Sequence, residues 1–153
     1  MTVSTLSSGD LLFLTGFRRD LAPLRCLEGF ANHSVPKSPG VYFLLAKPRY
    51  RFPYPKGKRS TVFYIGQAKN LWRRLKDHQK YICEAKQKRN RSLVRYYRRY
   101  EYAAAFGERY CFVRAKGCSP RALERRILLL FAERYGCCPI ANGAEVWERR
   151  RRR

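Results

Sequence analysis

The stretch SPGVYFLLA at residues 38–46 and the stretch TVFYIGQAKNL at residues 61–71 decide the fold. Both contain apolar and aromatic runs of strand length, Val41 to Ala46 and Thr61 to Ile65, and such runs predict β-strands. The segment between them, residues 47–60, holds three prolines and a glycine, which favours a loop over a strand. We therefore expect two antiparallel strands joined by a long loop.

Three helices and a third strand are expected to complete a single domain, because the chain shows no internal repeat and no second unit. Asn70 suits the N-cap of a helix that runs from Leu71 towards Arg89. Residues 92–105 are also expected to be helical, and residues 109–115 alternate polar and apolar side chains as a strand does. The clearest helix signals come last: Ser119 as a cap, Pro120 at the first position, and Gly136 after the final residue, Tyr135.

The two ends of the chain are expected to differ from the domain at residues 36–144. Residues 1–35 are interpreted as a partly helical leader, and residues 145–153, which end in five arginines, as a disordered basic tail. The apolar run Leu11–Leu14 is too short to cross a membrane, and Asp10 precedes it where a signal peptide would be basic. We therefore expect a cytoplasmic protein.

The charge of the chain indicates its partner. Its 153 residues include 34 Lys and Arg against 11 Asp and Glu, a formal net charge of +23, and no acidic residue lies between Glu28 and Asp77. Lys and Arg side chains displace condensed counterions from phosphates, so nucleic acid is the expected partner. The alternatives are a basic surface with no such partner and an anionic membrane, which we do not expect because the Arg-rich segments are also rich in Tyr.

The six cysteines form no C-x-x-C pair. Reduced thiols, as in a cytosol, are favoured over a zinc site made by Cys111, Cys118, Cys137 and Cys138, because that spacing matches no common zinc motif.

The scarcity of acids also limits the chemistry. Two-metal nucleases gather several carboxylates, whereas this chain has no Asp-x-Asp, no Pro-Asp and only two histidines. A site with one metal ion needs a single acid, and Glu124 is the candidate because it shares a helical face with Ile127, Leu128 and Phe131. A carboxylate on an apolar face is costly unless it is paired or binds a metal, so a buried ion pair with an arginine is the alternative. Glu133 falls on the other side of that helix.

Six motifs in order resemble those of the GIY-YIG nuclease superfamily over residues 36–144. Residues 38–44 resemble its first strand, with Val41 in place of the central Ile, and residues 62–71 resemble its second strand and the start of the next helix. The remaining matches are Arg74, ten residues after Tyr64, His78 one turn later, Ala122-Leu123-Glu124, and Pro139-Ile140-Ala141-Asn142.

The resemblance implies an α+β fold, a small three-stranded antiparallel sheet flanked by helices, that hydrolyses a phosphodiester with one Mg²⁺ or Mn²⁺ ion. In it Glu124 holds the metal, Arg74 binds the scissile phosphate, and Tyr42 or Tyr64 accepts the proton of the attacking water. His78 relays a proton or hydrogen-bonds a tyrosine, although its place in an apolar stripe is also typical of a core histidine. Asn142 fixes the site by hydrogen bonds or only shapes a loop.

Two segments that mix cations with aromatic side chains are expected to hold the substrate by phosphate contacts and stacking. The alternative for both is a solvated face whose aromatic residues pack on the core. The first is residues 47–60, with Tyr50, Phe52 and Tyr54 among the cations; the second is residues 95–100. The cations expected to bind nucleic acid are Arg49, Arg51, Lys56, Lys58, Arg59, Lys69, Arg73, Arg95, Arg98 and Arg99.

The sequence thus predicts a free-standing, metal-dependent DNA endonuclease. DNA is favoured over RNA as the substrate, and restriction, repair and mobile-element roles and a homodimer all stay open. The main alternative is a nucleic-acid-binding protein that keeps the fold without catalysis. A structural RNA-binding protein would explain the charge but not Glu124 on an apolar face.

Overall fold

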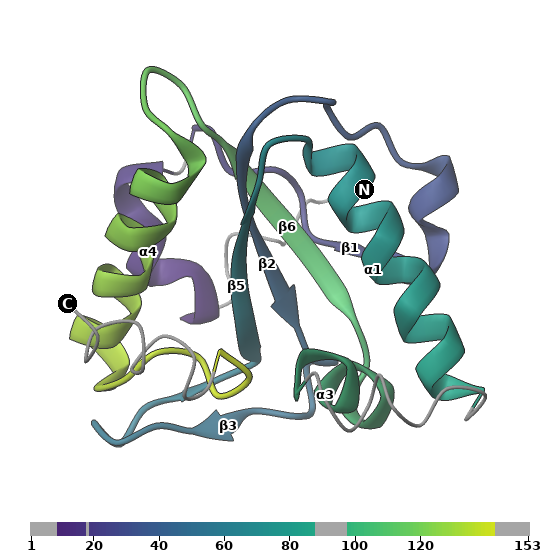
Figure 1. The fold of residues 1–153 in the computed structure, drawn as a ribbon. Helices are drawn as coiled ribbons and strands as arrows, with labels where there is room; N and C mark the ends of the chain where they lie inside the picture. Colours follow the sequence, from purple (N-terminus) through teal and green to yellow (C-terminus); the bar gives the residue numbers. More distant parts are fainter. Residues whose placement is uncertain (1–8, 18, 88–97, 143–153) are drawn as a thin grey trace, which may run out of the picture.

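The computed structural model describes residues 9–17, 19–87 and 98–142, which form one α+β unit. A four-stranded antiparallel sheet lies between two helical layers (Figure 1). Its strand order is β1 (Arg25–Cys26), β6 (Arg109–Arg114), β2 (Gly40–Leu45) and β5 (Val62–Ala68). On one side lie α4 (Pro120–Tyr135) and the 3₁₀ segment η2 (Gly9–Phe17); on the other lie α1 (Leu71–Lys86), α3 (Arg98–Phe106) and the 3₁₀ segment η3 (Leu27–Asn32).

Strand β2 is the centre of the sheet, and all six of its residues are buried. A strand covered on both faces needs apolar side chains throughout, which explains the unbroken run after Gly40. The expected antiparallel pairing with β5 is confirmed, with Tyr42 opposite Gly66 and Leu44 opposite Tyr64. Because directly opposed residues share a face, this register puts both motif tyrosines on the same face of the sheet.

Gly40 is required by the close approach of three elements. A Cβ atom at this position would lie 2.5 Å from the carbonyl oxygen of Val113 in β6 and 2.6 Å from Cδ1 of Leu71 in α1. Any larger residue would therefore push either the neighbouring strand or the start of α1 away. The close packing of β2, β6 and α1 thus explains why the GVY motif begins with a glycine.

Local capping signals explain the two long helices. The Asn70 side chain accepts a hydrogen bond from the Arg73 backbone N–H at 3.0 Å, and Ser119 accepts one from Ala122 N–H at 3.1 Å. Helix α4 ends at Gly136, whose φ of +97° is the left-handed conformation that favours glycine. Helix α4 therefore has its predicted bounds, whereas α1 ends at Lys86, short of the predicted Arg89.

The expectation of three strands is wrong by one short strand, because the leader contributes β1 to the edge of the sheet beside β6. The leader also supplies core residues. Leu11, Phe13 and Leu14 of η2 are buried, and the Phe13 ring packs edge-on against Phe131 of α4 with centroids 5.2 Å apart. The predicted helix at residues 92–105 is seen as α3 from Arg98; residues 88–97, like the tail at 143–153, lie outside the described residues.

The segment at residues 47–60 is not a simple loop. It forms a small hairpin in which β3 (Phe52–Pro53) pairs with β4 (Arg59–Ser60). Phe52 packs edge-on against Phe63, Tyr102 and Phe106, and Tyr54 is buried with its hydroxyl donating to the Val62 carbonyl at 2.7 Å. The prediction that these aromatic residues stack on bases is therefore wrong for Phe52 and Tyr54, which are core residues.

The cysteines carry no disulfide, and half of them are exposed: Cys26, Cys83 and Cys118. Across residues 9–17, 19–87 and 98–142, no three His, Cys, Asp or Glu side chains gather as metal ligands, so the zinc alternative has no support there. No helix in these residues combines the length and the apolar character that a membrane crossing needs.

Candidate active site

Tyr42, Arg74 and His78 meet between β2 and α1. The Tyr42 hydroxyl lies 2.7 Å from Nε2 of His78 and 3.5 Å from Nε of Arg74. Arg74 and His78 are one helical turn apart, so they lie on neighbouring positions of the same side of α1. His78 is fully buried, Tyr42 is 1% exposed and Arg74 is half-buried. The structure therefore brings these three predicted residues together.

Gly66 makes room for the Tyr42 ring. It lies directly opposite Tyr42 in the β2–β5 register, and a Cβ atom at this position would be 2.5 Å from the Tyr42 hydroxyl oxygen. With no side chain at Gly66, the phenol can lie across β5 towards α1. The glycine of the YIG motif is thus needed for the position of the Tyr42 hydroxyl.

His78 links two phenols through its two ring nitrogens. Nδ1 lies 3.2 Å from the hydroxyl of Tyr100, a buried residue of α3, while Nε2 contacts Tyr42. Burial, then the charges of Arg74 and Arg99, holds the pKa of His78 well below its ordinary value. Burial, with a smaller contribution from Tyr64, raises the pKa of Tyr42 well above its ordinary value, and Arg74 offsets only part of this rise. At neutral pH the core of the cluster is therefore a neutral imidazole between protonated phenols.

This burial predicts a pH-dependent stability. Below the ordinary histidine pKa of about 6.5 the unfolded chain binds a proton that native His78, held among Tyr42, Tyr100 and Arg74, does not. The free energy of unfolding should therefore fall as the pH drops below about 6.5, by up to about 1.4 kcal/mol per pH unit. Urea unfolding of the parent and of His78→Gln between pH 7.5 and 5 measures this, and the variant should have the flatter profile.

His33 is the matched control, since burial and then Arg25 also lower its pKa but its side chain is not fully buried. His33→Gln should leave most of the pH dependence in place. Identical slopes for the parent and His78→Gln would contradict the neutral, buried state of His78.

Tyr64 is the accessible phenol of the site. It is half-buried in the edge strand β5, with its ring centroid 6.1 Å from that of Tyr42 and 6.3 Å from that of His78. The Arg99 guanidinium lies over it, 5.3 Å from the ring centroid, and 4.9 Å from the ring of Tyr100. Cations over aromatic faces are attracted by the negative charge of the π-system.

Arg99 therefore belongs to this cluster, whereas the sequence suggested a surface contact to nucleic acid. Arg99 is half-buried on α3, and α3 packs against both α1 and β5. No local pattern ties α3 to β5, because that contact exists only after the chain has folded. The sequence signal was limited to the neighbouring pair Arg99 and Tyr100.

Glu124 lies in the other helical layer. It is half-buried on α4, next to the buried residues Leu123, Ile127 and Leu128. Helix α4 packs on β5 and β2 from the side of the sheet opposite α1, and both helices begin at the end of the sheet where β5 leads into α1 (Figure 1). Glu124 and Arg74 are the fifth and fourth residues of these two helices, so both belong to helix starts at the same end of the sheet, in opposite helical layers.

Asn142 holds the exposed edge of β5. Its side chain accepts a hydrogen bond from Ile65 N–H at 2.9 Å and donates one to the Ile65 carbonyl at 2.7 Å, as a paired strand would. The neighbouring Ala141 N–H donates to the Phe63 carbonyl at 2.8 Å. The backbone is therefore fixed by hydrogen bonds on both sides of Tyr64.

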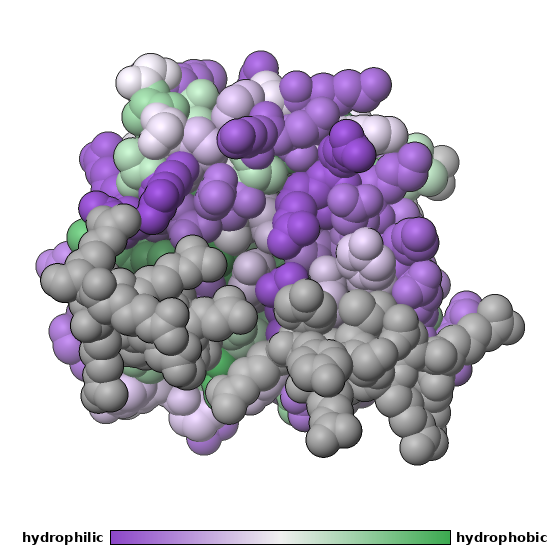
Figure 2. Space-filling view, viewed as in Figure 1, coloured by the Kyte–Doolittle hydropathy of each residue, from purple (hydrophilic) through white to green (hydrophobic). Residues whose placement is uncertain are grey.

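The cations expected to bind nucleic acid have different environments. Arg51 pairs with buried Asp10 at 3.1 Å, and Lys56 donates to the Glu133 carbonyl, so both are partly engaged. Arg95 and the side chain of Arg98 lie outside the described residues. Hydrophilic side chains cover much of the face that includes α1 (Figure 2). Besides Arg51 and Lys56, which are exposed as well, the exposed members of the set are Arg49, Lys58, Arg59, Lys69 and Arg73.

Comparison of the chain with protein-family models, curated proteins and solved structures found no match. The resemblance to GIY-YIG nucleases therefore rests on the motif residues of the sequence.

Proposed function

We propose that this protein is a metal-dependent DNA endonuclease with a GIY-YIG-like fold that hydrolyses phosphodiester bonds with one metal ion. The observation that carries the proposal is the packing of Arg74 against the buried Tyr42–His78 pair, beside the accessible Tyr64. A structural core would bury an apolar side chain at the Arg74 position. A half-buried guanidinium with a phenol beside it instead suits a phosphate group.

Arg74 has donors to spare for that phosphate. Within the described residues, the single hydrogen bond of its side chain is the long contact from Nε to the Tyr42 hydroxyl at 3.5 Å. The planar guanidinium can therefore direct its two terminal nitrogens at two oxygens of one phosphate. In the transition state the phosphate gains negative charge, and a donor already held in place stabilises it without reorganisation.

Tyr64 is the better general base, on grounds of access. Tyr42 is 1% exposed and already bound to His78, so water cannot approach its hydroxyl, whereas Tyr64 is half-exposed. The Arg99 guanidinium lies over the Tyr64 ring and helps to hold this accessible phenol in place, where its oxygen can meet a water molecule. Tyr42 and His78 then act as positioning residues that hold Arg74.

Glu124 is the residue that would hold the metal. Mg²⁺ retains several of its waters and is commonly bound through one or two carboxylates plus substrate phosphates, so a single protein ligand suits it. When bound, the ion neutralises phosphate charge and stabilises the leaving oxygen. The half-buried carboxylate on α4, a helix that starts at the same end of the sheet as the helix of Arg74, fits this donor set.

A plasmid assay tests the proposal. Purified protein is incubated with supercoiled plasmid in Mg²⁺, in Mn²⁺ and in EDTA, and nicked and linear products are followed by gel. We expect cleavage with either metal and none in EDTA. Binding without cleavage under every metal condition would contradict the proposal.

Tyrosine variants separate the two phenols. Tyr64→Phe should lower the cleavage rate at saturating DNA by about a hundredfold or more, since general base catalysis contributes 10²–10⁴-fold, and should leave the melting temperature nearly unchanged. Tyr42→Phe removes the hydroxyl that bonds His78 at 2.7 Å, so it should lower the stability as well as the rate. A fully active Tyr64→Phe variant would exclude Tyr64 as the base.

A nucleic-acid-binding protein without catalysis is the second candidate. Glu124 lies in the helical layer opposite Arg74, and this favours the second candidate. A metal ion held by Glu124 and a phosphate held by Arg74 would have the edge strand β5 between their protein ligands. This candidate predicts tight, salt-sensitive DNA binding with no cleavage, and no loss of binding on changing Tyr64 to Phe.

A further inference from the structure

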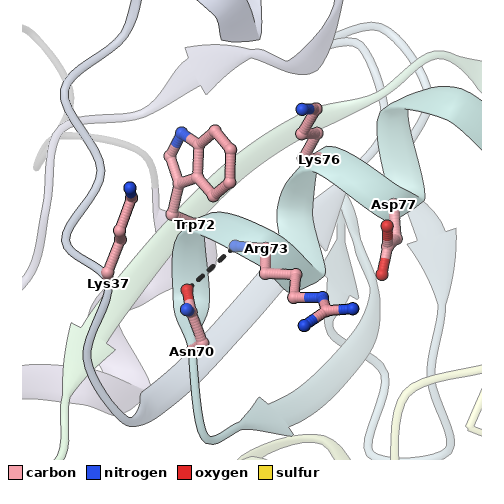
Figure 3. Close-up of a pocket in the computed structure, with 6 residues that line it drawn as sticks. All are labelled: Lys37, Asn70, Trp72, Arg73, Lys76 and Asp77. Atoms are coloured by element: carbon pink, nitrogen blue, oxygen red, sulfur yellow. Dashed lines mark hydrogen bonds between the residues drawn. The ribbon is translucent and has the colours of Figure 1, made fainter.

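A cationic hollow with a tryptophan at its centre lies on the outer side of α1, away from the tyrosine cluster. It has a volume of about 360 Å³ and is lined by Lys37, Asn70, Trp72, Arg73, Lys76 and Asp77 (Figure 3). Three of these lining residues are cations and one is a carboxylate. The half-buried Trp72 lies between two of the cations, with Nζ of Lys37 4.9 Å and Nζ of Lys76 4.8 Å from its ring centroid.

We propose that this hollow binds one unpaired base of a nucleic acid strand, which stacks on the Trp72 indole while Lys37, Arg73 and Lys76 hold the adjoining phosphates. An aromatic face among cations is the arrangement that binds single strands, because every base has a π-face and every link a phosphate. A hydrated ammonium on a flexible stem can leave the ring for a phosphate when a base takes its place. The Asn70 amide oxygen is already used as the helix cap, so the side chains of the hollow provide the contacts.

The position of Trp72 relative to Arg74 sets where such a base would lie. Two residues apart on a helix, the side chains point to nearly opposite sides, and a helix with its side chains is about 10 Å across. Phosphates of one DNA strand follow each other at about 3.4 Å along the duplex axis, so 10 Å is about three nucleotides. If Arg74 holds the cleaved phosphate, as the proposed function has it, the substrate has an unpaired base about three nucleotides away. This spacing depends on the proposed function, whereas the stacking on Trp72 does not.

Fluorescence tests the stacking directly, because the chain has two tryptophans and Trp147→Phe leaves Trp72 alone. The Trp147→Phe protein is titrated in EDTA with a thymidine oligonucleotide, and with a duplex of the same length. The single strand should quench the indole emission strongly and the blunt duplex should not. Trp72→Ala should weaken single-strand affinity between about fivefold and a hundredfold, measured by anisotropy of a labelled strand, and duplex affinity less than threefold.

Several variants make the result interpretable. Trp72→Phe keeps a ring and should retain part of the affinity that Trp72→Ala loses. Lys37→Gln and Lys76→Gln keep the indole, so quenching should persist while the dependence of affinity on salt decreases by about one ion each. Arg19→Gln removes a charge from an exposed residue outside the hollow and should leave quenching and affinity unchanged, and melting curves verify that each variant folds.

No quenching by the single strand, or equal losses for single strand and duplex in Trp72→Ala, would overturn the proposal and indicate a backbone-only contact or a different partner. Quenching by a protein that cleaves no plasmid under any metal condition would overturn the proposed nuclease function and leave the stacking site in place.

Discussion

Replacing Arg74 with alanine is expected to lower the rate of DNA cleavage at saturating DNA by at least about a thousandfold. Removing one preorganised donor to a developing oxyanion costs 10²–10³-fold, and an arginine at a transferring phosphoryl group is worth more. The variant should fold, because the side-chain hydrogen bond that it loses among the described residues is the long 3.5 Å contact to Tyr42. Single-turnover cleavage of a labelled duplex measures the rate, and binding of the same duplex in EDTA measures the DNA affinity.

Two controls separate this effect from loss of charge. Arg74→Lys keeps the charge but cannot bind two phosphate oxygens in one plane, so it should recover only part of the rate. Arg19→Ala removes the same charge from an exposed residue outside the site and should cleave at the parental rate. Cleavage by Arg74→Ala within tenfold of the parent would remove Arg74 from the mechanism.

Gly40→Ala is expected to give the largest loss of stability. The added methyl would lie 2.5 Å from the Val113 carbonyl oxygen and 2.6 Å from Leu71, and the first of these neighbours is backbone fixed by the β2–β6 pairing. Overpacking a core typically costs about 1–3 kcal/mol, and a clash with backbone belongs at the upper end, about 3 kcal/mol. Urea unfolding monitored by circular dichroism measures it.

Gly16→Ala is the matched control, since a Cβ atom there has no neighbour within 4 Å. Its free energy of unfolding should stay within about 0.5 kcal/mol of the parent, as for most surface changes. Equal midpoints for Gly40→Ala and Gly16→Ala would show that β2, β6 and α1 do not meet as closely as described.

Elements with local signals could be predicted from the sequence. The caps at Asn70 and Ser119 and the stop at Gly136 are short-range hydrogen bonds and backbone preferences, so they are legible in a few neighbouring residues. The apolar run of β2 likewise follows from its burial on both faces. The start of each long helix and the pairing of β2 with β5 were therefore predicted correctly.

Elements that depend on distant contacts could not be predicted. The leader joins the core through Phe13 and Leu14, which lie in a 3₁₀ segment with no helical periodicity. The two residues of β1 form a strand because they pair with β6, which is distant in the sequence. Phe52 and Tyr54 were misassigned for a related reason. Aromatic residues among arginines have the same pattern whether they pack inward or face a base. The packing of Phe52 against Phe63 and of Tyr54 against Phe131 shows that both point into the core.

In the candidate active site, too, some residue positions follow from local geometry and others from contacts between distant elements. Arg74 and His78 are one turn apart, so their convergence follows from helix geometry, and the motif tyrosines follow from strand register. Arg99 reaches the site on a third element, and the distance between Glu124 and the other groups depends on how α4 packs against the sheet. The spacing of residues along the chain therefore predicts neither the position of Arg99 nor that of Glu124.

The most direct test of the proposed active site is metal-dependent cleavage by Glu124→Gln beside the parent. The substitution keeps the size of the side chain and one acceptor oxygen but removes the charge that would hold Mg²⁺. We predict unchanged DNA affinity in EDTA and a loss of cleavage of at least about a hundredfold in both Mg²⁺ and Mn²⁺. Cleavage by Glu124→Gln at the parental rate in either metal would contradict it.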